Sequence, residues 1–189
     1  KSKPKSKKKI LYFDLNPEKT LILISIKKKY SNNDFENLGS SFYDFIKSNN
    51  FSFINILSET MVSNLSNSFN HFIHGFKLKS YEFTKYKSKK ELKNITIKII
   101  QNKNKSIYND LLKFKALEEG TFYTRDLVSE PGNILHPDEY AKRISSLKKD
   151  GLKVDIYDEK KLKKLGMNAL LGVGQGSIRG SYLVTMEWN

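Results

Sequence analysis

Two prolines, Pro131 and Pro137, place the strongest constraint on how this chain folds. Proline lacks the N–H that an interior helical position donates, and it disfavours helical geometry at the residue before it. A helix that approaches Pro131 must therefore end there, and the Gly132-Asn133 pair that follows is typical of a turn. Pro137 suits the first position of a new helix, and the two acidic residues after it complement the helix N-terminus. The sequence therefore predicts a hinge between two domains.

The segment before the hinge has the spacing of a helix, from about Ser106 to Val128. Four residues fall near one face of that helix: Leu111, Leu112, Tyr123 and Leu127. Gly120 lies inside it and costs about 1 kcal/mol relative to alanine. We therefore predict a long but locally weakened helix that carries the chain into the hinge.

Strands and helices alternate through the residues before this helix. Strands are predicted at Ile10–Asp14, Thr20–Ile26, Phe51–Leu57 and Asn94–Ile100. The second of these is an almost continuous apolar run, which suits a buried position. One helix is capped by Asn32 or Asn33 and has apolar residues at Phe35, Leu38, Phe42, Phe45 and Ile46. Another is predicted at Glu59–Phe76, and a polar loop at Gln101–Lys105. This alternation predicts an α/β layered domain.

After the hinge the predicted elements are shorter. The first is a helix with Tyr140, Ile144 and Leu147 on one face, and Asp150-Gly151 ends it. A strand follows over Leu152, Val154 and Ile156, and then a short helix that is capped by Asp158 and ended by Gly166. A glycine-rich loop leads to a strand at Tyr182–Trp188. Two strands joined through a helix predict a parallel βαβ unit in a sheet covered on both faces. Such a unit cannot bury its own surfaces, so we expect the domain to continue past Asn189.

Composition excludes several classes of protein. No run of about 18 apolar residues is present, so the sequence predicts no membrane span. The basic stretch Lys1–Lys9 is expected to be a disordered tail, and no apolar core follows it as in a signal peptide. The chain does not begin with methionine, so we expect its start to be cut or processed. The absence of cysteine leaves no disulfide or thiolate metal site and favours a cytoplasmic location.

The net charge of +14 raises the question of nucleic-acid binding. Only three of the 34 basic residues are arginine (Arg125, Arg143 and Arg179), whereas phosphate and base recognition favours arginine forks. Aromatic residues lie mostly at core spacing and do not alternate regularly with basic runs. Compositional drift toward lysine and asparagine therefore explains the charge better than a nucleic-acid surface, which stays the alternative.

Three histidines and one serine are candidates for chemistry. His71 and His74 share one side of a predicted helix, but no carboxylate lies nearby in the sequence, and we interpret them as a surface pair and not as metal ligands. Ser129, His136 and Asp126 are the residue types of a nucleophilic triad, yet they cluster in one hinge with no oxyanion donor identifiable. His136 is better explained as a helix-entry residue.

Two further groups favour structural roles. Arg125 with Asp126 or Glu130 is expected to form ion pairs that hold the two domains in register. The segment Gly172–Ser177 could be imagined as a phosphate cradle, but it lacks the Lys-Ser or Lys-Thr pair of a P-loop and the spacing of a dinucleotide fingerprint. A tight connection before a strand explains it better.

The hinge residues also carry a family resemblance. Arg125–Asn133, followed by Pro137–Ala141, is similar to the domain junction of the leucyl (cytosol) aminopeptidases. The resemblance continues through Leu165–Ser177 and the strand ending at Trp188, and Gly75–Lys90 resembles the motif late in the family's N-terminal domain. It covers residues 70–189 well and residues 10–70 loosely. Ser25-Ile26-Lys27-Lys28 stand where the family usually has a Gly-Leu-Gly-Lys turn.

The resemblance implies an α/β fold in four parts. These are a basic tail at 1–9, a macro-like N-terminal domain at 10–105, a linker helix and hinge at 106–133, and the first βα units of an incomplete α/β catalytic domain at 134–189. The last part is expected to be truncated.

The resemblance also implies a function. Members of the family are exopeptidases in which two divalent ions, zinc or manganese, polarise the scissile carbonyl and activate a water. They remove N-terminal residues from peptides, leucine prominently, and assemble as hexamers. The family's metal ligands, a lysine, aspartates and a glutamate, are expected beyond Asn189.

No residue of this chain is therefore assigned to catalysis, cofactor binding or metal binding. We expect the segment to bind no metal and to be inactive alone. The alternative is a non-catalytic remnant or a nucleic-acid-binding module derived from the family.

Overall fold

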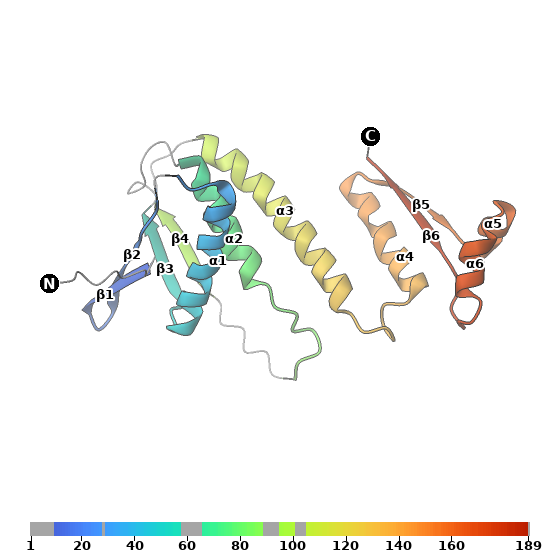
Figure 1. The fold of residues 1–189 in the computed structure, drawn as a ribbon, viewed down its shortest axis with the longest axis horizontal. Helices are drawn as coiled ribbons and strands as arrows, with labels where there is room; N and C mark the ends of the chain where they lie inside the picture. Colours follow the sequence, from blue (N-terminus) through green and yellow to red (C-terminus); the bar gives the residue numbers. More distant parts are fainter. Residues whose placement is uncertain (1–9, 28, 58–65, 89–94, 101–104, 189) are drawn as a thin grey trace. The chain divides into compact units, whose positions relative to one another are not determined.

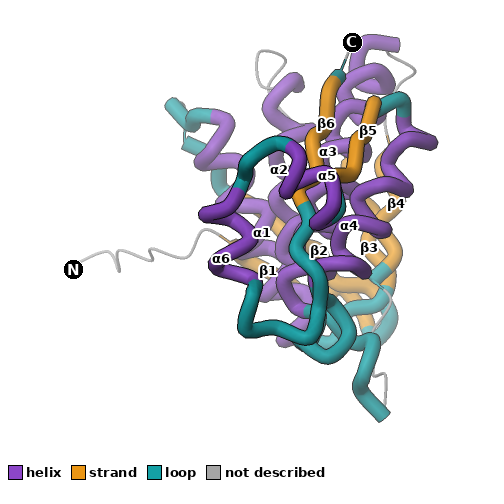
Figure 2. Tube along the Cα trace, turned by 90° about the vertical axis from the view of Figure 1, so that its right-hand side faces the viewer, coloured by secondary structure: helices purple, strands orange, loops and turns teal. Residues whose placement is uncertain are grey.

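The computed structural model describes residues 10–27, 29–57, 66–88, 95–100 and 105–188 (Figure 1). The chain divides into two compact units, one ending at Thr124 and one beginning at Arg125, and each is described by itself. Helices and strands are mixed in both units, which confirms the predicted α/β class (Figure 2). The predicted tail at residues 1–9 lies outside the described residues. Within the described ranges, no helix combines the length and the apolar content needed to cross a membrane.

The first unit contains four strands and three helices in the described ranges. In order they are β1 (Ile10–Asn16), β2 (Lys19–Ile24), α1 (Asn32–Ser48), β3 (Phe53–Leu57), α2 (Ser66–Ser80), β4 (Thr96–Ile100) and α3 (Lys105–Ser129), whose last residues belong to the second unit. Each corresponds to a predicted element. The described part of α2 continues to Ser80, beyond the predicted end at Phe76, and the predicted start at Glu59 lies outside the described residues. Lys105, predicted to close a polar loop, instead begins α3.

The strands form two pairs. β1 and β2 are an antiparallel hairpin, with Ile10 opposite Ile24. β3 and β4 are parallel, with Phe53 opposite Thr96, and α2 lies between them in the chain, as in a βαβ crossover. The prediction that β2 is buried was wrong, because Leu21 and Leu23 are 42% and 48% exposed. The strand alternates instead: Ile22 and Ile24 pack on the core, while the residues between them point away from it.

The hydrophobic core lies between these strands and the helices α1 and α2. Its buried members are Phe35, Leu38, Phe42, Tyr43, Ile46, Ile54, Phe69, Phe72, Ile73 and Phe76. The two helices approach so closely that a Cβ added at Gly39 would lie 1.9 Å from the carbonyl oxygen of Phe72. A Cβ added at Gly75 would lie 2.0 Å from the carbonyl oxygen of Glu36. Glycine at both positions is therefore a condition of this packing.

The helix α1 begins with a capping box. The Ser31 hydroxyl accepts a hydrogen bond from the Asp34 backbone N–H, and the Asp34 carboxylate accepts one from the Ser31 N–H at 2.9 Å. The prediction that Asn32 or Asn33 caps this helix was wrong by one or two residues. The reciprocal bond to Asp34 selects Ser31, because it satisfies two backbone donors at once.

The helix α3 continues through Gly120 without a break, which confirms the predicted long helix. Its predicted apolar face is only partly correct: Leu127 is buried, but Leu112 is 63% exposed. Of the α3 residues whose burial is described in the first unit, the one that is fully buried is Glu118, at 5% exposed. Apolar residues occur on several sides of α3, so their spacing alone did not identify the side that is buried.

The second unit begins with the end of α3. Its further elements are α4 (Pro137–Ser145), a short 3-10 helix η3 (Ser146–Asp150), β5 (Lys153–Tyr157), α5 (Glu159–Lys164), α6 (Asn168–Gly174) and β6 (Leu183–Glu187). The predicted stops are confirmed, since Gly151 and Gly166 have φ of 93° and 70°. The predicted Asp158 cap is also confirmed, by a 2.9 Å bond from the Lys161 N–H. On the predicted face of α4, Ile144 is buried as predicted, but Tyr140 is 46% exposed, and Ala141, which was not on that face, is buried.

The two strands of the second unit are antiparallel, so the predicted parallel βαβ unit was wrong. Tyr157 at the end of β5 lies opposite Leu183 at the start of β6. The connection between them contains two short helices of 6 and 7 residues, α5 and α6, which lie together beside one end of the β5–β6 strand pair (Figure 1). Because the chain returns at the end where it left, β6 runs against β5.

We predict that Gly39→Ala and Gly75→Ala each destabilise the protein by about 1–3 kcal/mol, because the new methyl group meets a backbone that cannot move aside cheaply. Gly120→Ala is the matched control, since a Cβ at this helical position has nothing within 4 Å. It should stabilise the protein by up to about 1 kcal/mol. Urea unfolding followed by circular dichroism measures all three, and stabilisation by Gly39→Ala would contradict the close approach.

Candidate functional site

The hinge between α3 and α4 is a structured turn. The carbonyl oxygen of Pro131 accepts hydrogen bonds from the N–H groups of Ile134 and Leu135, both at 2.9 Å. His136 is the N-cap residue of α4, which confirms its interpretation as a helix-entry residue, and Pro137 occupies the first turn as predicted. The local chemistry that the sequence predicted is therefore present.

Arg143 ties the hinge to α4. Its Nη1 donates to Glu130 Oε1 and its Nε to Glu139 Oε1, both at 2.9 Å. The Glu130 side chain is only 2% exposed, so its charge is paired inside the unit. The guanidinium lowers the pKa of the Glu139 carboxyl through that hydrogen bond, and the two carboxylates raise the pKa of Arg143. The sequence signal for the Glu139–Arg143 pair is a spacing of four residues on a helix.

The predicted pairing of Arg125 with Asp126 or Glu130 stays a prediction. The partner established for the Glu130 carboxylate is Arg143, a residue that sequence spacing did not indicate. Both belong to the second unit, so this ion pair fixes the start of that unit.

Asp138 links the start of α4 to the segment before β6. It is bonded to the His136 ring and lies 3.5 Å from Arg179 Nη1. Desolvation acts to raise the pKa of Asp138. The hydrogen bond with His136, a backbone hydrogen bond and the charges of His136 and Arg179 together outweigh it, so the pKa lies below its ordinary value. The carboxylate is therefore the negative partner of two surrounding basic groups.

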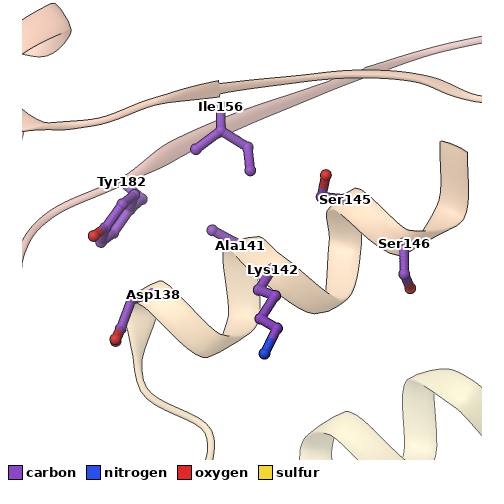
Figure 3. Close-up of a pocket in the computed structure, with 7 residues that line it drawn as sticks. All are labelled: Asp138, Ala141, Lys142, Ser145, Ser146, Ile156 and Tyr182. Carbon is purple, nitrogen blue, oxygen red and sulfur yellow. The ribbon is translucent and has the colours of Figure 1, made fainter.

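A shallow cavity of about 460 Å³ opens beside Asp138. It is lined by Asp138, Ala141, Lys142, Ser145, Ser146, Ile156 and Tyr182. Ile156 and Tyr182 face Ala141 and Ser145 across it, whereas Lys142 and Ser146 point away from the strands (Figure 3). The Ser146 hydroxyl donates to the Arg143 carbonyl at 2.7 Å. Among the lining residues there is no paired nucleophile and base, so the cavity suits packing or weak binding and not acyl transfer.

The candidate triad has a different arrangement from the one its residue types suggest. The Nδ1 atom of His136 is hydrogen-bonded to the carboxylate of Asp138, whereas the triad would require Asp126 in that place. Ser129 is the last residue of α3 and is exposed. The hinge geometry therefore supports the structural interpretation of these residues.

The two histidines of α2 are not the surface pair that we predicted. His74 is buried and its Nδ1 lies 3.1 Å from Glu118 Oε1, while His71 Nδ1 lies 2.7 Å from Glu36 Oε1. Both carboxylates come from other helices, so no local sequence signal revealed them. Phe114 packs against both rings, with centroid distances of 4.9 and 4.8 Å.

The glycine-rich segment is also corrected. Gly172 and Gly174 lie in the C-terminal half of α6, a helix predicted as loop, and only the residues after them form a turn. Anions bind helix N-termini, where N–H groups are unpaired, so this arrangement does not form a phosphate cradle.

The arrangement of donor atoms decides whether the described residues can hold a metal ion. In the part of the chain that the structure describes, no group of three or more His, Asp or Glu side chains is arranged to hold a metal ion. The described residues therefore do not fit the divalent ions that the resemblance implies.

The known proteins that this sequence resembles are cytosol aminopeptidases. The sequence model of the cytosol aminopeptidase family's catalytic domain matches residues 122–189. A probable cytosol aminopeptidase of Phytoplasma australiense is 34% identical over 184 residues, which cover 95% of this chain and 37% of that protein. The counterpart in Phytoplasma mali is 45% identical over 125 residues, covering 63% and 25%.

Solved structures show the same fold. A mutant of tomato leucine aminopeptidase aligns with a TM-score of 0.76 at 23% identity, covering 94% of this chain and 37% of that one. The bottromycin maturation enzyme BotP in complex with Mn aligns with a TM-score of 0.77 at 18% identity, covering 95% and 39%. The chain thus spans about two fifths or less of the length of these proteins.

We predict that Glu130→Gln destabilises the second unit by about 1–3 kcal/mol, because the buried Arg143 pair loses its charge balance. Lys153→Gln is the matched control, since its pair with Glu187 joins side chains that are 60% and 57% exposed. It should cost less than about 1 kcal/mol. Urea unfolding followed by circular dichroism measures both variants. Equal losses in both variants would contradict the role of Glu130.

We also predict an acid-sensitive contribution from Glu139. Because Arg143 lowers the pKa of this carboxyl in the folded state, its stabilisation is present above the ordinary glutamate pKa of about 4.3. It is lost as the pH falls through the lower folded pKa. The stability difference between the wild type and Glu139→Gln, measured in urea from pH 7 to pH 3, should therefore stay constant and then shrink. A difference that grows on acidification would overturn this assignment.

Proposed function

Because this chain belongs to the cytosol aminopeptidase family, we propose that it forms the N-terminal domain and the beginning of the catalytic domain of a metal-dependent aminopeptidase. One observation carries the proposal: 184 aligned residues are 34% identical to a probable cytosol aminopeptidase, and the match to the family's catalytic domain begins at residue 122. That position lies near the end of α3, where the second compact unit also begins.

The reaction proposed for the whole protein is hydrolysis of the N-terminal peptide bond, with leucine favoured. Two divalent ions, zinc or manganese, would supply the Lewis acid and the activated water. The manganese-bound BotP structure, which shares the fold, supports a metal-dependent reaction. The family resemblance implies that the ligands of these ions lie in the remainder of the protein, and we derive no catalytic step from the described residues, which do not fit such ions.

The proposed architecture is a macro-like domain followed by a linker helix. The parallel pair of β3 and β4, its crossover through α2 and the packing of α1 on α2 support an α/β sandwich of this kind. We further propose that the whole protein acts on peptides as a homo-hexamer. In that assembly the residues described above would position the catalytic domain, with Arg143 and Asp138 holding its first helix.

A nucleic-acid-binding module is the second candidate, and the net charge of +14 is the observation that favours it. Binding by phosphate neutralisation would weaken steeply as salt is raised. The family match says nothing of such a ligand, so this candidate stays second.

The test joins residues 1–189 to the remainder of the Phytoplasma australiense relative, in place of the segment that matches. We predict that the chimera releases leucine from leucine p-nitroanilide with added Mn²⁺ and stops when the metal is chelated, as the relative itself should. Residues 1–189 alone should release none. A folded chimera without activity would contradict the proposed function, and release by residues 1–189 alone would contradict the proposed position of the metal ligands.

A further inference from the structure

The linker helix α3 is docked on the first unit through a charged residue. Glu118 is 5% exposed, whereas the neighbouring apolar residues Leu112 and Leu117 are 63% and 49% exposed. Burial of apolar surface normally decides which side of a helix faces the protein. Here the most buried position described in the first-unit part of α3 holds a carboxylate, which is costly to bury unless it is paired.

The pairing comes entirely from α2. Glu118 Oε1 lies 3.1 Å from His74 Nδ1, and Glu118 Oε2 lies 3.0 Å from Lys77 Nζ. His74 and Lys77 are three residues apart, so they project from the same face of α2. Lys77 is 44% exposed and reaches the buried carboxylate from the rim of the contact. Each oxygen of Glu118 therefore has its own partner.

Aromatic contacts flank this pair on both sides and recur at a spacing of four along α3. Phe114 lies one turn before Glu118 and packs against His71 and His74, and Phe122 lies one turn after it and packs against Tyr81 at 5.3 Å. If α3 slid along α2 by one turn, a phenylalanine would take the place of Glu118. The apolar contacts alone would tolerate that slip, since they recur every four residues.

We propose that Glu118, with His74 and Lys77, sets the helical register of α3 on α2. In a slip toward Tyr81 the carboxylate would take the place of Phe122 against that ring and leave both basic groups without their acceptor. In the opposite slip it would take the place of Phe114 beside the two histidines and leave Lys77 without its acceptor. In the observed register the other two carboxylates at this contact have their own partners: Glu36 lies against His71, and Asp110 lies 3.4 Å from the Asn70 amide nitrogen. Buried polar groups that select one register among several apolar ones are the best-attested use of such pairs.

This register has a consequence along the chain. The helix α3 belongs to the first unit up to Thr124 and to the second unit from Arg125. The position of Glu118 on α2 therefore determines how the first-unit part of α3 lies on α2. Glu118 is a positioning residue, not a catalytic one.

The experiment measures the register directly. The chain has no cysteine, so spin labels can be placed at single introduced cysteines. Lys113 on α3 is paired in turn with Asn33 and with Ser48, exposed residues near the two ends of α1. A slip of one turn moves α3 by about 5.4 Å and changes these two distances unequally. Pulsed electron–electron double resonance resolves such a shift.

With Glu118 present we expect one narrow distance for each pair. Glu118→Leu should add a second component, displaced by up to about 5 Å, while helicity is retained. Glu119→Leu is the matched control, because Glu119 is exposed and should leave a single distance. A single unshifted distance in folded Glu118→Leu would overturn the proposal. If that variant does not fold, His74→Leu with Glu118→Leu removes the buried unpaired group and leaves only Lys77, which is 44% exposed, without its acceptor. One unshifted register in the double variant overturns the proposal equally.

Discussion

The first unit depends on a contact between two helical backbones. Gly39 of α1 and Gly75 of α2 each lie against a carbonyl group of the other helix, with no room for a side chain between them. That spacing lets the rings of Phe42, Phe72 and Phe76 interlock beside the crossing, with centroids 5.5 and 5.8 Å apart. The strands then cover the apolar side of the helix pair, so the core follows from the two glycines.

Buried carboxylates connect the helices to what surrounds them. Glu118 attaches α3 to α2, and Glu130 attaches the hinge to α4. Each is paired with a basic side chain from another helix, because a charge removed from water requires such a partner. The chain has 34 basic and 20 acidic residues, and these two acidic residues each hold two segments of the fold together.

The family assignment depends on the hinge and the segments around it, and the structure gives those residues a positioning role. The turn after Pro131, the His136 N-cap and the Arg143 pairs hold the first helix of the second unit in place. The cavity beside Asp138 adds a surface but no paired catalytic groups among its lining residues. These residues therefore position a part of the catalytic domain that we propose, and they do not supply its reacting groups.

Local features were determined by the sequence itself. Pro131, Pro137, Gly151, Gly166 and Asp158 end or begin elements through bonds to near neighbours, and all were predicted correctly. The tertiary structure decided the rest: His74 is buried by a glutamate 44 residues away, Leu112 is exposed because Glu118 faces α2, and β6 runs against β5 because the connection returns at the same end. A cap or a turn needs only the next few residues, whereas burial and strand direction depend on partners that the local pattern does not contain.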